Sequence, residues 1–307
     1  MSEDTNTART PVGPPWIRPE RQKDIVWRDG DIVISVPAKS GTTWTMNIVH
    51  QLLSGGDADF RDVYAEVPWI EFVAHPEEAP EALHDRIGAM PRDRRRAFKT
   101  HSAPPVLPYI AGEGAPRVKY VVVARNPEEA IVSFWPFLGK HSSEWITLWG
   151  LPPEVLKRND FATFYADHVA TGMHEHGFYG FIEAWWPLRD NPNVLFLHYT
   201  DMKRDHEGSI RRIATFLEIE PDDAQWERIL EYTSFAWMKA HEEKFEGSTT
   251  SETRILERGA MIRRGETGAA HSDGMTEAIA AELRAIGERV CSDPRALQWY
   301  YSGGVLP

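Results

Sequence analysis

The sequence predicts an α/β fold, a P-loop-like three-layer sandwich with a central parallel sheet flanked by helices. Apolar runs of strand length at 32–36, 120–124 and 194–197 alternate with segments of helical spacing. This alternation favours a parallel sheet with right-handed crossovers. The chain has 307 residues, of which 42% are hydrophobic and 12 are tryptophan, enough for one large domain with a substantial core.

The limits of this domain follow from composition. Residues 1–15 are polar and rich in Thr, Pro and Gly, so we expect a disordered tail over 1–20 and a single domain over 21–307. The stretch 60–96 should be irregular, and 241–257 should form a mobile loop. Helical spacing predicts helices over 161–171, 178–189, 210–217 and 222–232.

Charge and cysteine content exclude several classes of protein. Lys and Arg number 34 against 46 Asp and Glu, a net charge of −12, which argues against a general nucleic-acid binder. The one cysteine, Cys291, excludes an intrachain disulfide and suits a reducing compartment. The sequence displays no signal peptide and no long apolar span, so we expect a cytoplasmic protein without a membrane partner.

The first strand and the helix after it enclose a loop suited to an anion. Pro37 ends the apolar run, 38–41 form a tight loop, and helical spacing begins at Thr42. The helix N-terminus offers unpaired N–H groups and a positive dipole end, and Lys39 adds a full charge. The hydroxyls of Thr42 and Thr43 are further donors. The Walker pattern is absent because the lysine precedes the glycine, so we infer a mononucleotide-like anion held without a required metal.

The second unit carries an arginine at the end of its strand. Strand 120–124 ends before Arg125, at the edge where ligands bind in open α/β sheets, and Pro127 starts the next helix. Ser133 lies about two turns along that helix. A guanidinium suits a phosphate, although a salt bridge at the sheet edge is the alternative. Later in the chain, the pair Arg263 and Arg264 before Gly265 also suits an anion.

These segments resemble the cytosolic-type sulfotransferases, which use 3′-phosphoadenosine-5′-phosphosulfate (PAPS). Pro37-Ala-Lys-Ser-Gly-Thr-Thr-Trp44 is similar to the family's 5′-phosphosulfate loop, with one extra alanine before the lysine. Segment 118–134 resembles the 3′-phosphate site, and 261–268 resembles the segment that closes over that phosphate. The matching segments occur in the family's order from Ile32 to Gly268.

The resemblance implies a set of nucleotide contacts. Tyr199 corresponds to a tyrosine near the adenine, Trp44 would stack on the base, and 233–235 resembles a purine-binding segment, although each of these residues could equally be core. The residues implied in PAPS binding are Lys39, Ser40, Gly41, Thr42, Thr43, Trp44, Arg125, Ser133, Tyr199, Thr233, Ser234, Phe235, Arg263, Arg264 and Gly265.

The chemistry is expected at Ala97-Phe-Lys-Thr-His101. Alternation along a strand places Lys99 and His101 on the same side. A histidine is the side chain best matched to removing a proton at neutral pH, and the resemblance implies His101 as the catalytic base. Lys39 and Lys99 can neutralise charge on the leaving oxygen. We therefore predict in-line transfer without a metal, with adenosine 3′,5′-bisphosphate (PAP) as product.

Aromatic residues flank these segments and suggest a flat, apolar acceptor. We expect a small molecule with a hydroxyl or amine, for example a phenol or a hydrophobic alcohol. About half of the rings should instead pack the core or a lid. The candidates are Trp69, Phe72, Phe134, Trp135, Phe137, Trp145 and Trp149.

The chain departs from the family after Gly268. The family continues Asp-Trp-Lys, whereas this chain has Ala269-Ala270-His271. The family's short dimerisation motif is therefore degraded, which leaves a homodimer open. His174 and His176 form the only close histidine pair, and we expect a solvated loop there rather than a metal site.

Two other functions are compatible with the same loop. A P-loop-type kinase would use Lys39 and require magnesium and ATP. A nucleotide-binding protein that has lost catalysis would bind PAP and transfer nothing, and His101 beside Lys99 disfavours it.

Overall fold

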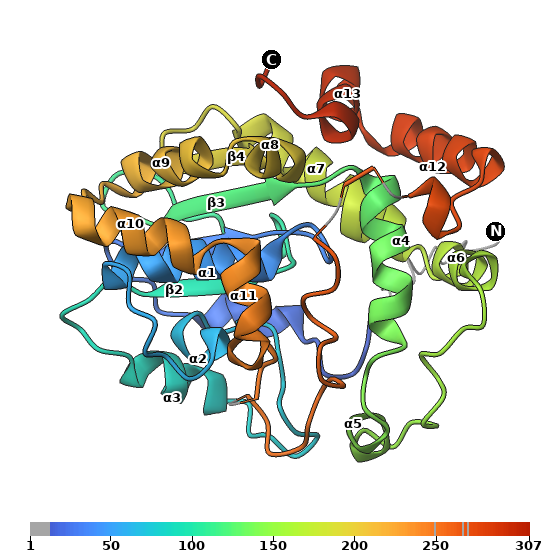
Figure 1. The fold of residues 1–307 in the computed structure, drawn as a ribbon, viewed down its shortest axis with the longest axis horizontal. Helices are drawn as coiled ribbons and strands as arrows, with labels where there is room; N and C mark the ends of the chain where they lie inside the picture. The colour runs from blue at the N-terminus through green and yellow to red at the C-terminus, as the bar shows by residue number, and fades with distance from the viewer. Residues whose placement is uncertain (1–12, 249, 266, 269) are drawn as a thin grey trace, which may run out of the picture.

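The computed structural model describes residues 13–248, 250–265, 267–268 and 270–307 (Figure 1). Its centre is a four-stranded parallel sheet with the strand order β2-β1-β3-β4. In the middle of the sheet, Ile34 of β1 pairs with Lys99 of β2 and with Val121 of β3. The strands are β1 (Ile32–Ser35), β2 (Ala97–Thr100), β3 (Lys119–Ala124) and β4 (Val194–His198).

Helices cover both faces of this sheet. Along β3, Tyr120 and Val122 belong to one apolar cluster, and Val121 and Val123 belong to another. Successive strand residues point to opposite faces, so these clusters are the two cores of a three-layer sandwich. The predicted fold class is therefore confirmed.

The helices divide between the two cores. On the face of Val121 lie α1 (Thr42–Ser54), α2 (Val63–Glu66), α8 (Tyr199–Arg204), α9 (His206–Leu217), α10 (Asp223–Tyr232) and α11 (Phe235–Ala240). On the face of Tyr120 lie α3 (Ala82–Ala89), α4 (Pro127–Leu138), α6 (Phe161–Ala170), α7 (Gly180–Trp185), α12 (Glu277–Val290) and α13 (Pro294–Ser302). A third, smaller cluster holds α5 (Ser143–Leu148).

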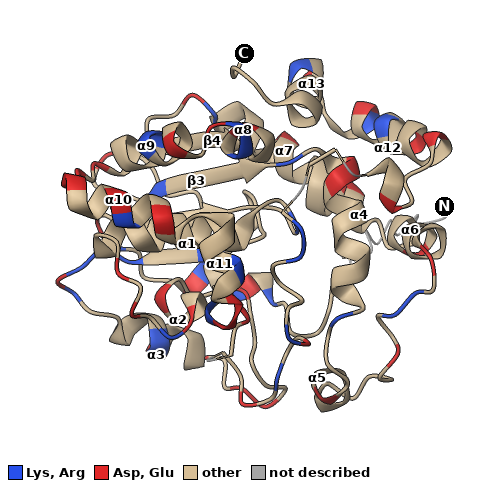
Figure 2. Ribbon diagram, in the orientation of Figure 1, with Lys and Arg blue, Asp and Glu red and all other residues tan. Residues whose placement is uncertain are grey.

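Charged residues lie mainly on the outer helices and loops. In Figure 2 the outer helices alternate red and blue, whereas β3 is tan except at its first residue, Lys119. A few charged residues are buried instead, among them Lys99 of the candidate site and the ion pair of Arg96 with Asp31. Within the described ranges, no helix combines the length and the apolarity needed to span a membrane.

The predicted element starts agree closely with the structure where a turn or cap signal marks them. Helix α4 begins at Pro127, and the Asn126 side chain before it accepts hydrogen bonds from the N–H groups of Glu128 and Glu129. Helix α10 follows Asp222, which forms a capping box with Gln225. Caps of this kind satisfy the free N–H groups of the first turn.

The prediction of one helix over 178–189 is wrong in its details. The region is a π-helix (Glu175–Tyr179) that continues into α7 and ends in a 3-10 helix (Trp186–Leu188). Of the histidine pair expected in a solvated loop, His176 is exposed as expected, although it lies in the π-helix, whereas His174 is buried. His174 is only 2% exposed and stacks on Tyr165, with ring centroids 5.8 Å apart. Apolar packing of the ring explains this burial.

Two expected flexible segments pack against the molecule. Trp16 is 4% exposed and Pro19–Asp24 forms a 3-10 helix, so the described part of the predicted tail 1–20 packs against the domain. Residues 1–12 lie outside the described part. In the predicted loop 241–257, Phe245 and Leu256 are buried and Glu242–Phe245 is a 3-10 helix. Thr249 lies outside the described residues. Both segments are polar in overall composition, but a few apolar side chains in each are buried against the domain and hold the segment in place. The remaining short 3-10 helix is His271–Asp273.

Candidate active site

The loop between β1 and α1 has the backbone geometry of an anion cradle. Lys39 has φ +61° and Gly41 has φ +97°. A Cβ at Gly41 would meet the Tyr199 ring at 2.7 Å, so only glycine fits there. Helix α1 begins at Thr42 without a side-chain cap, and its first N–H groups therefore keep their capacity to bind a ligand.

Two hydroxyls of this loop differ in what they contact. The Thr42 Oγ1 atom is buried and has no hydrogen-bond partner among the described residues. A buried hydroxyl without a partner is costly, and a bound anion would satisfy it. Ser40 is fully buried, and its N–H donates to the Pro37 carbonyl at 3.2 Å. Ser40 therefore supports the loop from behind, and it does not line the cavity described below.

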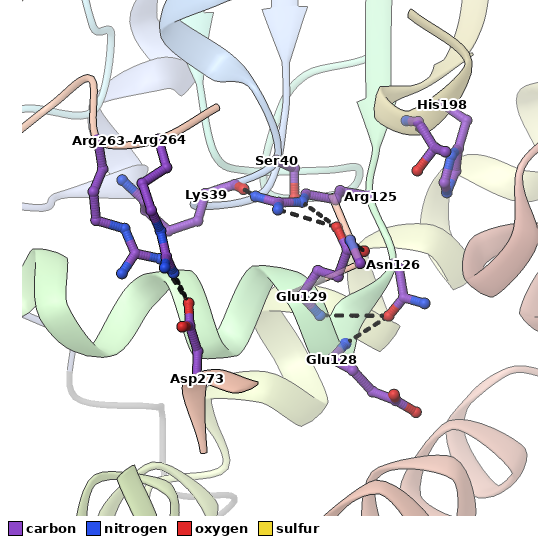
Figure 3. A network of polar contacts seen from close by, with 12 residues as sticks. Lys39, Ser40, Arg125, Asn126, Glu128, Glu129, His198, Arg263, Arg264 and Asp273 are labelled. Carbon is purple, nitrogen blue, oxygen red and sulfur yellow. Dashed lines mark hydrogen bonds and ion pairs between the residues drawn. The ribbon is translucent and has the colours of Figure 1, made fainter. Parts of the chain in front are cut away.

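Arg125 ties the loop to the end of β3. Its Nη1 atom donates to the Lys39 carbonyl at 2.9 Å, and its guanidinium lies 4.6 Å from the centre of the Tyr199 ring. The same side chain forms a salt bridge of 3.1 Å with Glu129, one helical turn away (Figure 3). The salt bridge that the sequence offered as the alternative role of Arg125 is therefore present in the structure. Glu129 also accepts a hydrogen bond from the Gly268 N–H at 2.6 Å.

The arginine pair 263–264 also lines the cavity described below. Arg263 and Arg264 both point toward Asp273 (Figure 3), and the Arg263 pair measures 3.2 Å. Gly265 has φ +63°, and a Cβ there would meet Phe235 at 2.5 Å. The glycine therefore lets the arginine segment approach this ring closely. Sequence reasoning missed Glu129 and Asp273; the spacing of Glu129 from Arg125, one turn of a helix, was its only local signal.

Aromatic and polar groups lie beside the α1 loop at the position predicted for a purine. The Trp44 indole donates to the Thr233 carbonyl at 2.9 Å and lies edge-on to Tyr199, with ring centroids 5.8 Å apart. Phe235 is 41% exposed, a large free ring face. Thr233 is different, because it is fully buried and its hydroxyl donates to the Ile229 carbonyl at 2.7 Å. Thr233 thus positions Trp44 and does not line the cavity.

The end of β2 brings Lys99 and His101 to the same cavity, as strand alternation predicted. The Lys99 Nζ atom lies 3.0 Å from the centre of the Trp69 ring, and the side chain is 2% exposed. Burial, with Lys39 as a smaller contribution, holds the pKa of Lys99 well below its usual value, although Glu71 opposes this shift. Burial and then the charge of Lys99 hold the pKa of His101 well below its usual value. A neutral imidazole therefore lies beside an amine that readily gives up its proton.

The His101 ring has a defined tautomer. Its Nδ1 atom lies 2.6 Å from the Val36 carbonyl oxygen. A carbonyl only accepts, so Nδ1 carries the hydrogen and Nε2 keeps its lone pair. The Nζ atom of Lys39, in the loop before α1, lies 4.0 Å from the centre of the Phe137 ring. Burial, followed by the charges of Arg125 and Arg263, lowers the pKa of Lys39 to about 7.

One cavity of about 600 Å³ joins these groups. Among the aromatic residues predicted to line an acceptor site, Trp69, Phe72, Phe134 and Phe137 do so. The other three lie outside the lining. The Trp135 indole donates to the Arg158 carbonyl at 3.1 Å, and Trp145 and Trp149 pack behind Trp16, with ring centroids 5.7 and 5.9 Å from it. The prediction that some rings would pack behind the site therefore applies to these three.

Sequence reasoning missed several residues of the wall because they lie far apart in the chain. They are Trp16, Tyr64, Glu71, His141, Met173, Phe178 and His206. The remaining predicted residues in the lining are Gly41, Thr42, Thr43, Ser133, Tyr199, Ser234 and Gly265.

The comparisons with known proteins agree with this geometry. A family model described as a sulfotransferase domain matches residues 29–294. Mouse sulfotransferase 1B1 is 30% identical over 224 residues, which cover 72% of this chain and 69% of that protein. Human sulfotransferase 1C2 is 28% identical over 243 residues, which cover 78% and 75%.

Solved structures give the same fold. Mouse sulfotransferase SULT7A1, complexed with PAP, has a TM-score of 0.66 at 20% identity and covers 91% of this chain and 90% of its own. A retinol dehydratase in complex with retinol and PAP has a TM-score of 0.65 at 22% identity and covers 88% and 83%. At such identities the likeness concerns the arrangement of the sheet and helices.

Proposed function

The chain belongs to the sulfotransferase family, and from this premise we propose that it transfers the sulfuryl group of PAPS to a hydroxyl of a small apolar acceptor. PAPS supplies an activated sulfuryl group on a phosphate leaving group. The observation that carries the proposal is that Lys39, Lys99, His101 and Arg125 line one cavity together with aromatic walls. We call Arg125, Arg263 and Arg264 the nucleotide end of this cavity, and Lys39, Lys99 and His101 the reaction end.

The residues present fit a sulfated nucleotide. The unpartnered Thr42 Oγ1 atom, the uncapped α1 terminus and Lys39 provide donors for a phosphosulfate. The guanidinium of Arg125 and those of the 263–264 pair suit a 3′-phosphate. Trp44 and Phe235 offer ring faces for a purine. Among the described residues, no group of three His, Cys, Asp or Glu could hold a metal ion, and every step below uses side chains alone.

His101 is suited to remove the acceptor's proton. Its Nδ1–H is held by the Val36 carbonyl, so Nε2 accepts the hydroxyl proton as the acceptor oxygen forms its bond to sulfur. The bond from sulfur to the bridging oxygen breaks, and its electron pair stays on the phosphate. Lys39 and Lys99 stabilise that developing charge, because a cation in a buried site acts through a low dielectric.

The acceptor should be a phenol or a hydrophobic alcohol. The cavity volume of about 600 Å³ falls within the range of sites for small organic ligands. Trp69, Phe72 and Phe134 line the same cavity as His101, and their apolar surface favours an apolar body around one reactive hydroxyl. A cytoplasmic location and a homodimer stay predictions.

The test is a transfer assay with PAPS against a panel of phenols, hydrophobic alcohols and amines, read by the release of PAP. Replacing His101 by Ala should lower kcat by about 100-fold or more and change PAP affinity less than about threefold. The matched control is His75→Ala, because His75 is exposed.

Each alternative has its own outcome in this assay. Magnesium-dependent turnover of ATP would favour the P-loop kinase. Tight PAP binding without transfer to any acceptor would favour a protein that has lost catalysis. Equal kcat for the His101→Ala variant would show that another group is the base.

A further inference from the structure

A buried carboxylate lies behind the reaction end and takes no part in the steps above. Glu71 belongs to the segment between α2 and α3, borders the cavity and is only 1% exposed. A buried carboxylate persists only when hydrogen bonds or cations compensate its charge. The compensation here comes from groups that hold the reaction end.

Both carboxylate oxygens of Glu71 accept hydrogen bonds. Oε1 accepts from the His101 backbone N–H at 2.6 Å and from the Trp69 indole at 2.9 Å. Oε2 accepts from the Ser102 hydroxyl at 2.5 Å and the Gln22 amide at 3.1 Å, and it lies 3.0 Å from the Thr100 hydroxyl. The carboxylate thus fixes the chain on both sides of His101.

The indole that Glu71 holds is itself a wall of the reaction end. The Trp69 ring faces the Lys99 Nζ atom at 3.0 Å and lies edge-on to the His101 ring, with centroids 5.0 Å apart at 79°. A shift of this ring would therefore move both the ammonium and the imidazole. Displacements of about 1 Å in such groups can cost two orders of magnitude in rate.

Among the described residues, Glu71 is the carboxylate whose charge acts on Lys99. Lys39 faces it from the α1 loop, His101 from the end of β2, and the neutral Tyr64 ring from α2 at 5.4 Å. Burial lowers the pKa of Lys99, and the carboxylate opposes that shift. Without the carboxylate, a larger share of Lys99 would be neutral when the leaving group needs a cation.

We propose that Glu71 is a positioning residue that sets His101 and Trp69 in place and supplies the negative charge facing Lys99. The inference rests on the proposed sulfuryl transfer. It assigns Glu71 no contact with either substrate, because the residue is only 1% exposed and both of its carboxylate oxygens accept hydrogen bonds from the chain.

The test compares Glu71→Gln and Glu71→Asp with the wild type, using PAPS and 2-naphthol, or the hydroxyl compound that the acceptor panel turns over fastest. Gln keeps the shape and removes the charge, so kcat at pH 7 should fall about 10-fold or more while KM for PAPS changes little. The pH optimum should move down, because a lower pKa of Lys99 requires a higher proton concentration to keep it charged. Asp keeps the charge, so its optimum should stay at the wild-type pH although kcat falls.

The control is Glu183→Gln. Glu183 lies on α7, outside the cavity lining, and its carboxylate accepts a hydrogen bond of 2.9 Å from the Ser292 N–H. It should leave kcat and the pH optimum unchanged. Equal kcat loss at every pH for Glu71→Gln, or the same optimum for all variants, would overturn the charge role. Unchanged kcat in both Glu71 variants would overturn the whole inference. Absence of transfer by the wild type would overturn the proposed function instead.

Discussion

The two ends of the cavity hold their cations in opposite ways. At the nucleotide end, Arg125 pairs with Glu129, and Arg263 and Arg264 share Asp273. At the reaction end, Lys39 and Lys99 lie against ring faces, and in the described part of the chain neither forms a salt bridge. A guanidinium keeps its charge in any surroundings, whereas a buried lysine readily loses it.

This difference separates binding from catalysis. On the proposed assignment, the nucleotide end is charged before a ligand arrives, and we expect a phosphate to compete with the carboxylates that pair with its arginines. We expect the reaction end to become fully charged when an anion is bound, because the anion raises the pKa of each lysine. Lys39 and Lys99 would then both be charged in the complex, beside the leaving oxygen.

The largest expected effect on nucleotide affinity tests the nucleotide end. Replacing Arg125 by Ala removes a charged donor fork and should weaken PAP binding about 30- to 100-fold, as expected for a lost charge-assisted bond. Adenosine 5′-monophosphate has no 3′-phosphate, so its affinity should change less than about threefold. Isothermal titration calorimetry measures both affinities. Arg125→Lys serves as the control that keeps the charge and loses the fork.

Two results would contradict this assignment. An equal loss for both nucleotides would mean that Arg125 acts by holding the Lys39 carbonyl rather than a 3′-phosphate. Unchanged PAP affinity would place the 3′-phosphate elsewhere.

The second prediction tests the charging of the reaction end. Burial lowers the pKa of Lys39 to about 7, and a bound phosphate should raise it. Between the free and bound pKa values the complex holds more protons, so PAP binding should take up protons and weaken as pH rises. Titration of Lys39 alone predicts that PAP affinity falls about fivefold from pH 7 to 8 and that PAP binding takes up about 0.9 proton at pH 8.

Calorimetry at pH 8 in buffers of different ionisation enthalpy measures this uptake, and at that pH a phosphate ligand is already fully ionised. Lys39→Met should reduce the uptake by nearly one proton. Lys23→Met, a change at an exposed lysine, should leave it unchanged. Proton release on binding, or the same uptake in both variants, would show that Lys39 is charged before the ligand arrives.

The sequence predicted the parts of the site that are local in the chain. The strand–loop–helix from Ile32 to Ser54 and the Arg125 turn carry their own signals, namely an apolar run, Pro37, Gly41 and Pro127. Their backbone conformation follows from neighbours in the chain, so the pattern was sufficient.

The parts that depend on tertiary packing could not be predicted in the same way. Glu71 and Trp16 reach the site from segments whose composition indicated irregular structure or a tail. Asp273 lies beyond the last matching segment. Helices α12 and α13 were not predicted, although Thr276 caps the first and Pro294 starts the second. Both start signals are local in the chain and therefore readable from the sequence.

The smallest expected effect tests the exchange of carboxylate for phosphate. Asp273→Asn removes the acid shared by Arg263 and Arg264, which are both about 40% exposed. Solvent screens pairs of this kind, so PAP binding should tighten only about two- to threefold, and the gain should shrink in high salt. Asp29→Asn, at the exposed pair with Arg117, is the control and should leave affinity unchanged. Weaker PAP binding by Asp273→Asn would show that the carboxylate holds the arginines in their binding positions, and the nucleotide end would then be organised by its acids rather than restrained by them.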